Sequence, residues 1–550
     1  MRKIRPITGL IALVTAGTLA LAGCSGGGST GGTSGASNVL TVMANSVPSY
    51  QKNFNPFSSS VNLGTKGLIY EPLILNSPVK TDGIPWLATK MSWANGGKTA
   101  KFTIRDGVNW SDGKPFTAKD VAFSFNLLHK FPATNTAALP VASASASGNT
   151  VTVKLNAVAY SYQQALGNFT PVPEHLWADQ DASKWTNPQP VGTGPFTLGK
   201  YSAQLLSFSK NPKYWQADKI KVDKIDYPAA TPQTFVSNLG AGKYDWSGGF
   251  VANIDKVYVS KDKEHNKYWF PGDGLVNLVM DLQKKPFDDV QLRKAISLGL
   301  NRQELSQTAE QGYEPVANPT GLVLPALQSY LDPKYKDAKF TQDVAKANAI
   351  LDKAGYKKGA DGVRVGPDGK KLSFDLSVPS GYTDWVTMTK LIQQQLKQIG
   401  IQVKPQGVSS QSWSAALHSG SFDMTIAGAS MGTGAYSLYR SFMSKDLSAP
   451  KGKNATQNYA RWEDPTTEKY LSQYESTNDK QKQLKAIQGL EGIVVDKLPV
   501  IPMLDSANWF EYRTARFTGW PTEDNPYAMP APYSFPDSML VIQHLRPVGK

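Results

Sequence analysis

Residues 102–128 read FTIRDGVNWSDGKPFTAKDVAFSFNLL, and this stretch decides the fold. Apolar and polar side chains alternate over 101–105, which predicts a half-buried strand. Two Asp-Gly pairs then predict turns. Thr117 is followed three residues later by Asp120, as in a capping box, so a helix is predicted over 118–130. The apolar face of that helix carries Val121, Phe125 and Leu128.

Strands and helices alternate along the rest of the chain. Further strands are predicted at 39–43, 151–155, 372–378, 401–403 and 422–426, and further helices at 290–303, 345–354 and 383–399. The order strand, helix, strand over 372–403 predicts a βαβ unit. Because 550 residues exceed what one core of ~250–300 residues holds, we expect an α/β fold of more than one lobe. The Pro- and Gly-rich residues 188–195 are expected to cross between lobes.

The N-terminus has the pattern of an export signal. A basic start and an apolar stretch over 7–19 precede Leu21-Ala22-Gly23-Cys24, which holds the only cysteine. Leu-Ala-Gly-Cys resembles the bacterial lipobox. Residues 1–23 are therefore predicted to be a lipoprotein signal peptide, and Cys24 to carry a diacylglyceryl anchor in the membrane. Ordinary secretion with an incidental cysteine is the alternative. Residues 24–38, rich in Gly and Ser, predict a flexible tether.

Charge and motifs argue against several other functions. The formal charge is +14, and removing Arg2, Lys3 and Arg5 leaves +11, spread along the chain without a basic stripe. No nucleic-acid partner is therefore expected. A phosphate loop ending in Gly97-Lys98-Thr99 is rejected because Ser92 stands where that loop requires Gly. No histidine is followed by Glu, and one lipidated cysteine leaves no thiol nucleophile. We expect no metal, no cofactor and no enzymatic activity.

The quoted stretch resembles the signature of the family 5 solute-binding proteins of ABC importers, a group with oligopeptide-, dipeptide-, nickel- and oligosaccharide-binding members. Other hallmarks follow in the family's order: Tyr70-Glu71-Pro72-Leu73, Pro85-Trp86-Leu87-Ala88, Val191-Gly192-Thr193-Gly194-Pro195-Phe196, Asn211-Pro212-Lys213-Tyr214-Trp215, Pro286-Phe287-Asp288-Asp289 with Arg293-Lys294-Ala295, and Ala354-Gly355-Tyr356. The resemblance implies two hinged lobes that close on a solute, an ABC permease as partner and a separate ATPase. Most hallmarks are interpreted as structural, with Gly192 and Gly194 as turn residues.

The order of the motifs also implies the boundaries of the parts. Lobe I of this two-lobed periplasmic-binding-protein fold is expected to comprise 39–62, 190–284 and 496–550, with an extra subdomain over 63–189. Lobe II is expected to comprise 285–495. We expect a monomer on the extracellular face of the bacterial cytoplasmic membrane, or in the periplasm if the cell has an outer membrane.

Two stretches bear on the identity of the solute. Peptide-binding members carry an acidic segment whose carboxylate pairs with the peptide's amino group, and the corresponding residues 427–436 contain no carboxylate. Burying an unpaired ammonium is costly, so this loop argues against short peptides, although a carboxylate elsewhere could substitute. Residues 517–527 (FTGWPTEDNPY) resemble members that take up cello-, xylo- or chito-oligosaccharides. An oligosaccharide is the preferred ligand and an oligopeptide the alternative.

Seven residues are candidate ligand contacts, because the ends of strands are expected to face the cleft. They are Asn55, Trp246, Trp385, Trp413, Ser430, Tyr436 and Trp520. Trp246 follows the strand-like residues 243–245 and Trp385 follows the strand predicted at 372–378, and an indole can stack on the apolar face of a sugar ring. The serine and the tyrosine belong to the Gly-rich loop, and Asn55 lies on the first loop of lobe I. Trp413 is a weaker candidate because it lies on a helix, and Trp520 could equally brace lobe I.

Overall fold

The computed structural model describes residues 38–549 except 45–46, 59 and 81. Helices and strands alternate through these residues, which confirms the predicted α/β class. The predicted signal peptide (1–23), Cys24 and all of the tether except Asn38 lie outside the described residues. Within the described part of the chain, no helix is long and apolar enough to cross a membrane.

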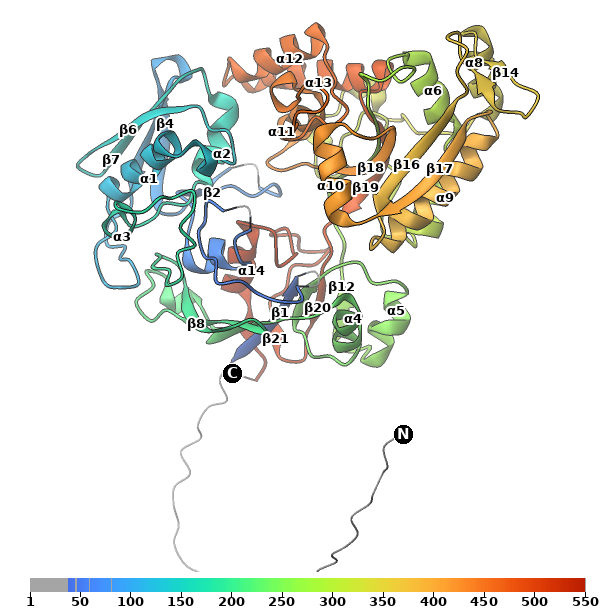
Figure 1. Ribbon diagram of the computed structural model, residues 1–550. Helices are drawn as coiled ribbons and strands as arrows, with labels where there is room; N and C mark the ends of the chain where they lie inside the picture. Colours follow the sequence, from blue (N-terminus) through green and yellow to red (C-terminus); the bar gives the residue numbers. More distant parts are fainter. Residues whose placement is uncertain (1–37, 45–46, 59, 81, 550) are drawn as a thin grey trace, which may run out of the picture. The chain divides into compact units, whose positions relative to one another are not determined.

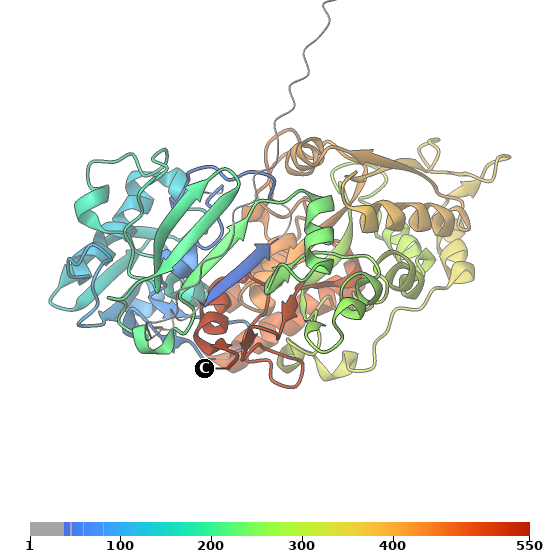
Figure 2. The same cartoon turned by 90° about the horizontal axis from the view of Figure 1, so that it is seen from below.

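A seven-stranded sheet contains the first strand of the described chain. Its order is β12 (Asn266–Tyr268), β20 (Glu511–Arg513), β11 (Trp246–Gly248), β1 (Val39–Ala44), β10 (Lys224–Pro228), β9 (Leu205–Lys210) and β8 (Phe196–Ser202). Strand β1, predicted from its apolar run, is parallel to both β10 and β11 and lies inside the sheet (Figure 2). Phe235 of α4 (Pro232–Gly240) and Ile254 of α5 (Ile254–Val257) belong to a small core that includes Met43 of β1.

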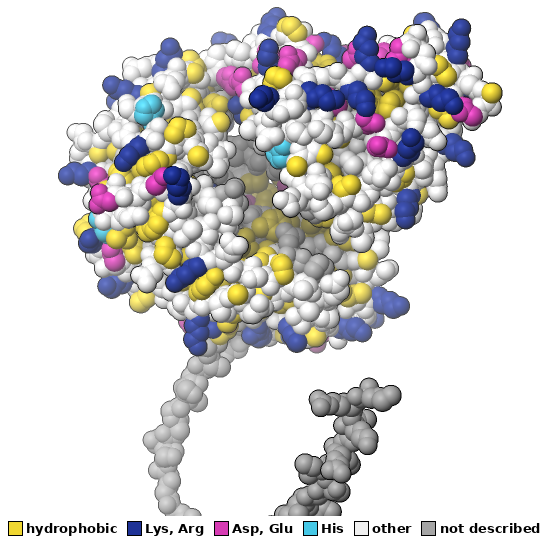
Figure 3. Space-filling model, viewed as in Figure 1, with side chains coloured by type: hydrophobic (Ala, Val, Ile, Leu, Met, Phe, Trp, Pro, Cys, Tyr) yellow, Lys and Arg dark blue, Asp and Glu magenta, His cyan; other side chains and the backbone are white. Residues whose placement is uncertain are grey.

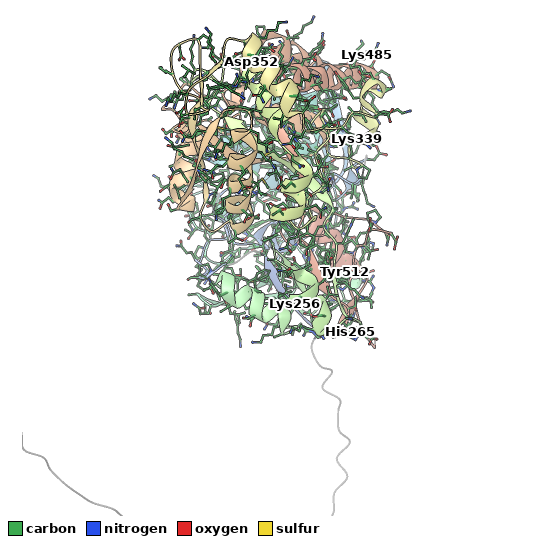
Figure 4. The ribbon with its side chains drawn as sticks, turned by 90° about the vertical axis from the view of Figure 1, so that its right-hand side faces the viewer. Lys256, His265, Lys339, Asp352, Lys485 and Tyr512 are labelled. Atoms are coloured by element: carbon green, nitrogen blue, oxygen red, sulfur yellow. The ribbon has the colours of Figure 1, made fainter. Side chains whose placement is uncertain are left out.

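A five-stranded sheet forms the second large layer (Figure 1). Its order is β17 (Gln402–Val408), β16 (Ser373–Pro379), β18 (Met424–Ser430), β13 (Gly272–Met280) and β19 (Ile501–Ala507). One face packs against α6 (Val290–Gly299), α8 (Val344–Lys353) and α9 (Thr383–Lys397), and the other against α11 (Ala435–Met443), α12 (Pro465–Glu475) and α13 (Lys480–Lys497). Figure 4 shows Asp352 of α8 and Lys485 of α13 at the end of the described part opposite Tyr512 of β20. Strands β16 and β17 are parallel around α9, so the predicted βαβ unit is confirmed.

The quoted stretch folds as predicted inside a four-stranded sheet. That sheet has the order β4 (Ala88–Ala94), β5 (Thr99–Ile104), β7 (Thr150–Leu155) and β6 (Val141–Ser147), and α1 (Ala118–Lys130) packs on it. The hydroxyl of Thr117 accepts a hydrogen bond from the amide of Lys119 at 3.2 Å. The carboxylate of Asp120 accepts one from the amide of Thr117 at 2.9 Å. These bonds satisfy amides that the first helical turn leaves free, and they explain why the helix begins where predicted.

The remaining elements are short. They are β2 (Ile74–Leu75), β3 (Ile84–Pro85), α2 (Gln163–Gly167), α3 (Glu174–Trp177), α7 (Arg302–Glu304), β14 (Lys357–Lys358), β15 (Arg364–Val365), α10 (Ser410–Ser419), β21 (Phe517–Thr518), α14 (Asp537–His544) and β22 (Arg546–Pro547). The helix predicted over 290–303 ends early, at Gly299, because Leu300 is extended. The side chain of Asn301 then caps α7, accepting from the amide of Glu304 at 3.1 Å.

Several of the family hallmarks meet at one buried carboxylate, Glu71, whose side chain has no solvent exposure. It accepts hydrogen bonds from Trp86 Nε1 at 2.6 Å, from Tyr214 Oη at 2.7 Å and from Trp215 Nε1 at 3.2 Å. Burial raises the pKa of Glu71 to about 7, although these donors act in the opposite direction. Motifs far apart in the sequence therefore hold one polar centre inside the core.

Gly192 and Gly194 were expected to be turn residues, but neither has a positive φ. A Cβ at Gly192 would lie 1.9 Å from the carbonyl oxygen of Ile69, and one at Gly194 would lie 2.3 Å from that of Leu68. Two backbone segments approach each other here so closely that only glycine fits. The glycines are needed for packing between segments rather than for a turn.

The strands also bear on where the chain crosses between lobes. Strands β13 and β19 belong to the five-stranded sheet, whose other strands lie in the expected lobe II. The expected boundaries at 285 and 495 put β13 and β19 in lobe I instead. The two crossing segments run side by side, since the amide of Trp269 donates to Phe510 at 3.0 Å and that of Asn508 donates to Pro271 at 2.8 Å. We therefore propose lobe boundaries near 271 and 508.

Candidate functional site

Three cavities meet around the Gly-rich loop that follows β18. The sheet cavity, of about 340 Å³, lies between β13, β18, α11 and residues 457–460. The central cavity, of about 320 Å³, and the tyrosine cavity, of about 190 Å³, lie on the other sides of the loop. Ser430 and Gly432 line both the sheet and central cavities, and Thr433 lines both the central and tyrosine cavities. One short loop thus connects three spaces.

The central cavity is assembled from three distant parts of the chain. Asn76 and Asn168 come from the expected subdomain, residues 430–433 come from the end of β18, and residues 533–537 come from the C-terminal part. Figure 3 shows a hollow in one face of the molecule, with hydrophobic side chains visible inside it. A space enclosed by different parts of the chain is the usual form of a small-molecule site.

Two carboxylates line the central cavity. Asp273 accepts a hydrogen bond from Asn508 Nδ2 at 2.8 Å and another from the hydroxyl of Ser430, and burial raises the pKa of Asp273. Asp537 accepts from Ser77 Oγ at 2.7 Å and from the amide of Met529 at 2.6 Å. Burial raises the pKa of Asp537 to about 6. Among the described residues, no Lys or Arg forms an ion pair with either group.

The tyrosine cavity lies between the expected subdomain and α11. Tyr436 is stacked on Tyr474, with ring centroids 4.3 Å apart and planes 10° apart, and its hydroxyl donates to Glu475. Among the described residues that line this cavity, Lys480 is the only charged one, and most of the others present amides, hydroxyls and tyrosine rings. Nearby, Arg440 Nη2 donates to Tyr162 Oη at 3.2 Å and joins α11 to the 63–189 segment.

The structure places four of the predicted contacts in two groups. Ser430 and Tyr436 flank the loop and line its cavities. Trp385 and Trp413 contact each other edge to face with centroids 6.0 Å apart, and Tyr382 packs on Trp385 at 5.3 Å. These three rings form an aromatic cluster beside the end of β16, and none of them lines the three cavities.

The other three predicted contacts are buried and already bonded. Asn55 donates from Nδ2 to the carbonyl oxygens of Ala182 and Trp185, both at 2.8 Å. Trp246, at 1% exposure, begins β11 and donates from Nε1 to Pro530 at 2.8 Å. Trp520 packs against Trp246 with centroids 6.0 Å apart. All three side chains pack inside the protein, and neither tryptophan has an exposed ring face. Their contact with a ligand therefore stays a prediction.

Sequence reasoning missed several polar residues in the cavities, namely Asp273, Asn277, Gln457, Tyr474 and Asn508. Asn277 carries a signal that could have found it, because it interrupts the apolar run Leu275-Val276-Asn277-Leu278-Val279-Met280. A polar side chain inside a buried strand needs a partner or a function. The described residues contain no group of three or more His, Cys, Asp or Glu side chains placed to hold a metal ion.

Comparisons with known proteins agree with the fold. Residues 83–448 match the family described as bacterial extracellular solute-binding proteins, family 5. The oligopeptide-binding protein OppA of Bacillus subtilis is 26% identical over 534 residues, which cover 90% of this chain and 93% of that protein. The crystal structure of a periplasmic oligopeptide-binding protein of Thermotoga maritima has a TM-score of 0.85 and 26% identity, covering 93% of this chain and 99% of its own.

A second structure of a periplasmic oligopeptide-binding protein from Thermotoga maritima, with mannohexaose bound, has a TM-score of 0.81 and 24% identity over the same shares of the two chains. The family match covers more than half of the sequence, and the expectation raised by the motifs is confirmed. This chain belongs to the family 5 extracellular solute-binding proteins, the two-lobed binding proteins of ABC transporters.

Proposed function

We propose that this protein is anchored outside the cell through Cys24, captures a cello-, xylo- or chito-type oligosaccharide in the cleft around residues 430–437, and delivers it to an ABC permease. The main supporting observation is the lining of the sheet and tyrosine cavities, which consists of amides, hydroxyls, aromatic rings and small apolar residues; among the described residues that line them, Lys480 is the only charged one. A neutral polyhydroxylated ligand needs such groups, whereas a free peptide brings two charged ends to be paired.

Two further observations support a sugar. The aromatic cluster of Tyr382, Trp385 and Trp413 is partly open, and such rings can stack on the C–H face of a pyranose. The Thermotoga protein with mannohexaose is named an oligopeptide-binding protein, so the name of that relative and the ligand in its structure belong to different chemical classes. The name of a relative is therefore a weaker guide to the ligand of this protein than the residues that line its cleft.

An oligopeptide is the second candidate, and one observation favours it. Asp273 and Asp537 line the central cavity, and among the described residues neither forms an ion pair with a Lys or Arg, so a carboxylate outside the loop is available to an amino group. Several relatives, including the Bacillus subtilis protein, are named for peptide binding. A ligand with a protonated amine would be held at this cavity.

A ligand screen separates the two candidates. The chain without residues 1–24 is mixed with cello-, xylo- and chito-oligosaccharides and with di- to pentapeptides, and thermal unfolding and tryptophan fluorescence are followed. A ligand at about 100 times its Kd adds about 2.7 kcal/mol to the free energy of unfolding, enough for a visible shift. Stabilisation by one sugar series and by no peptide is the expected result. Stabilisation by peptides alone would contradict the oligosaccharide proposal and support the alternative.

The membrane anchor is tested separately in cells. Replacing Cys24 by Ser removes the thiol that would carry the lipid, so the protein is expected to leave the washed membrane fraction and to appear in the medium, and any protein that stays with the membrane is expected to be an uncleaved precursor of larger mass. Immunoblots of membrane and medium fractions measure this. A Ser25→Ala variant is the matched control, and equal membrane retention of all three proteins would contradict anchoring through Cys24.

A further inference from the structure

Asn277 is an unpaired polar side chain in the middle of a buried strand. It lies on β13, has 1% exposure, and its Oδ1 has no hydrogen-bond partner among the described residues. Its neighbours along the strand are apolar. A buried amide oxygen without a partner opposes folding, so its presence needs a compensating role.

The local backbone directs Asn277 toward a cavity. The register between β13 and β19 shifts between Val276 and Asn277, where Asn277 lies opposite Pro502. Proline has no amide hydrogen to donate to the neighbouring strand, and such a bulge re-aims the side chain beside it. On the other side of β13, Asn277 lies opposite Ala427, whose small side chain leaves space between the sheet and α11.

This space is the sheet cavity, and the side chains that line it suit an uncharged polar ring. Its volume of about 340 Å³ falls in the range of small-molecule sites. Hydroxyls of Ser437 and Ser441 and the amide of Gln457 lie around it, and Phe442 and Tyr459 supply aromatic surface. In the described part of the chain, no Asp, Glu, Lys, Arg or His lines it.

The sheet cavity adjoins the central cavity at the loop. Ser430 and Gly432 line both, and both residues are exposed. A chain-like ligand that occupies the central cavity can therefore extend one end past this loop. The uncharged lining would accept a neutral terminal unit and would oppose a charged terminus, because nothing there could pair with it.

We propose that the sheet cavity is an end pocket that takes the terminal neutral sugar unit of the oligosaccharide, with the side-chain amide of Asn277 hydrogen-bonded to that unit's hydroxyls. This inference rests on the proposed oligosaccharide function. It assigns a recognition role to a residue inside the core of the five-stranded sheet. The cost of burying the unpaired amide in the free protein is then offset when the ligand binds.

An Asn277→Leu variant tests the pocket, because affinity and stability are expected to respond differently. The probes are cellotetraose, xylotetraose, chitotetraose and mannohexaose, with calorimetry for binding and thermal unfolding for stability. The variant is expected to bind the best probe at least tenfold more weakly, while its ligand-free Tm is equal to or above that of the wild type. Gln394→Leu is the control, since that amide lines a cavity on the outside of the same sheet, and it is expected to bind like the wild type.

A second variant keeps the test decisive if Asn277→Leu does not fold. Ala427→Val fills part of the sheet cavity from the neighbouring strand and is expected to weaken the same probe. If the wild type binds a probe, and both variants fold and bind that probe with a Kd within twofold of the wild-type value, the end-pocket proposal is wrong and the oligosaccharide function stands. The end-pocket proposal would also be overturned if Asn277→Leu lowered both the Tm and the affinity while Ala427→Val bound the probe as tightly as the wild type. If the wild type binds peptides and no sugar probe, the proposed function itself fails.

Discussion

At the scale of single residues, Glu71 illustrates how a buried charge organises the core. Its carboxylate accepts from two indoles and one phenol that come from hallmark motifs more than a hundred residues apart in the chain. A carboxylate at this place gives each of these buried donors a partner. The motifs thus act together through one side chain, which no single motif shows when read alone.

Replacing Glu71 by Ala is expected to lower the free energy of unfolding by about 3 kcal/mol or more, because each buried donor left without a partner costs about 1–3 kcal/mol. Urea unfolding followed by tryptophan fluorescence measures the change. Glu264→Ala is the control, since the Glu264 side chain is 85% exposed and its loss is expected to change little. Equal stability of both variants would show that the donors find other partners.

Glu511 offers a test of pH dependence at the same scale. It has no exposure and accepts from Ser247 Oγ at 2.8 Å, and burial raises the pKa of Glu511 from 4.5 to about 8. The folded protein therefore keeps this proton up to about pH 8, whereas the unfolded chain releases it near pH 4.5. Stability is present in full at low pH and falls as the pH rises through this window.

A Glu511→Gln variant cannot lose a proton, so its unfolding free energy is expected to fall less steeply with pH. The reduction in slope is expected to reach about 1.4 kcal/mol per pH unit for one such group. Urea unfolding at several pH values between 4.5 and 8 measures it. Glu264→Gln should keep the wild-type slope, and an identical slope in Glu511→Gln would contradict the raised pKa.

At the scale of elements, the role of a tryptophan depends on the element that carries it. Trp246 begins the interior strand β11 and is enclosed by the core, with Trp520 and the Pro530 carbonyl as neighbours. Trp385 lies in the first turn of α9, where one side remains open and Trp413 covers another. Both residues follow predicted strands in the sequence, yet only the second keeps exposed aromatic surface.

The two tryptophans are expected to behave differently when replaced by Ala. Trp246→Ala is expected to destabilise the fold by about 3–5 kcal/mol through the cavity it leaves. Trp385→Ala is expected to leave Tm nearly unchanged and to weaken oligosaccharide binding by about 1–3 kcal/mol if the ring stacks on the ligand. Thermal unfolding and calorimetry distinguish these results. Unaltered affinity in a folded Trp385→Ala protein would remove the aromatic cluster from the site.

At the scale of the whole molecule, binding by two-lobed proteins depends on contacts that form when the lobes close on a ligand. The guanidinium of Arg440 lies 5.7 Å from the ring centroid of Tyr162 and also donates to its hydroxyl. These residues belong to α11 and to the 63–189 segment, and their neighbours Ser437 and Ser161 line the tyrosine cavity. We therefore propose that this pair helps to hold the cleft closed over a ligand.

Replacing Arg440 by Ala is expected to speed ligand release about five- to thirtyfold, because a cation–π contact contributes about 0.5–1 kcal/mol and the hydrogen bond adds a similar amount. Stopped-flow tryptophan fluorescence measures the rate. Lys130→Ala is the matched control, since Lys130 lies over the ring of its neighbour Phe131 within one segment. A release rate equal to that of the control would argue against a closing contact here.

Much of the fold could be predicted because local rules decide it. The capping pair Thr117 and Asp120 set the start of α1, and alternation set β5 and β7. Glycines in the left-handed region end two further helices, with Gly355 after α8 and Gly400 after α9. Such signals act within one turn or one strand, so they can be read without knowing what packs nearby.

The candidate site could be predicted only in part. Residues 427–436 stood out because they lack a carboxylate, and Ser430 and Tyr436 from that loop do line cavities. Which aromatic rings remain open could not be read from the sequence, because Trp246, Trp385 and Trp520 look alike there. Burial depends on neighbours that are hundreds of residues away, such as Pro530 for Trp246.

The sequence by itself determined the family, the α/β class, the positions of α1, α6, α8 and α9 and of several strands, and the absence of a carboxylate from the loop. Only the tertiary structure decided that β13 and β19 join the five-stranded sheet, that Gly192 and Gly194 serve close packing, and that Asn277 faces a cavity. The physical reason is the distance along the chain over which each interaction acts. Propensity, capping and periodicity act between near neighbours, whereas strand partners, burial and cavities arise from segments that meet only when the whole chain has folded.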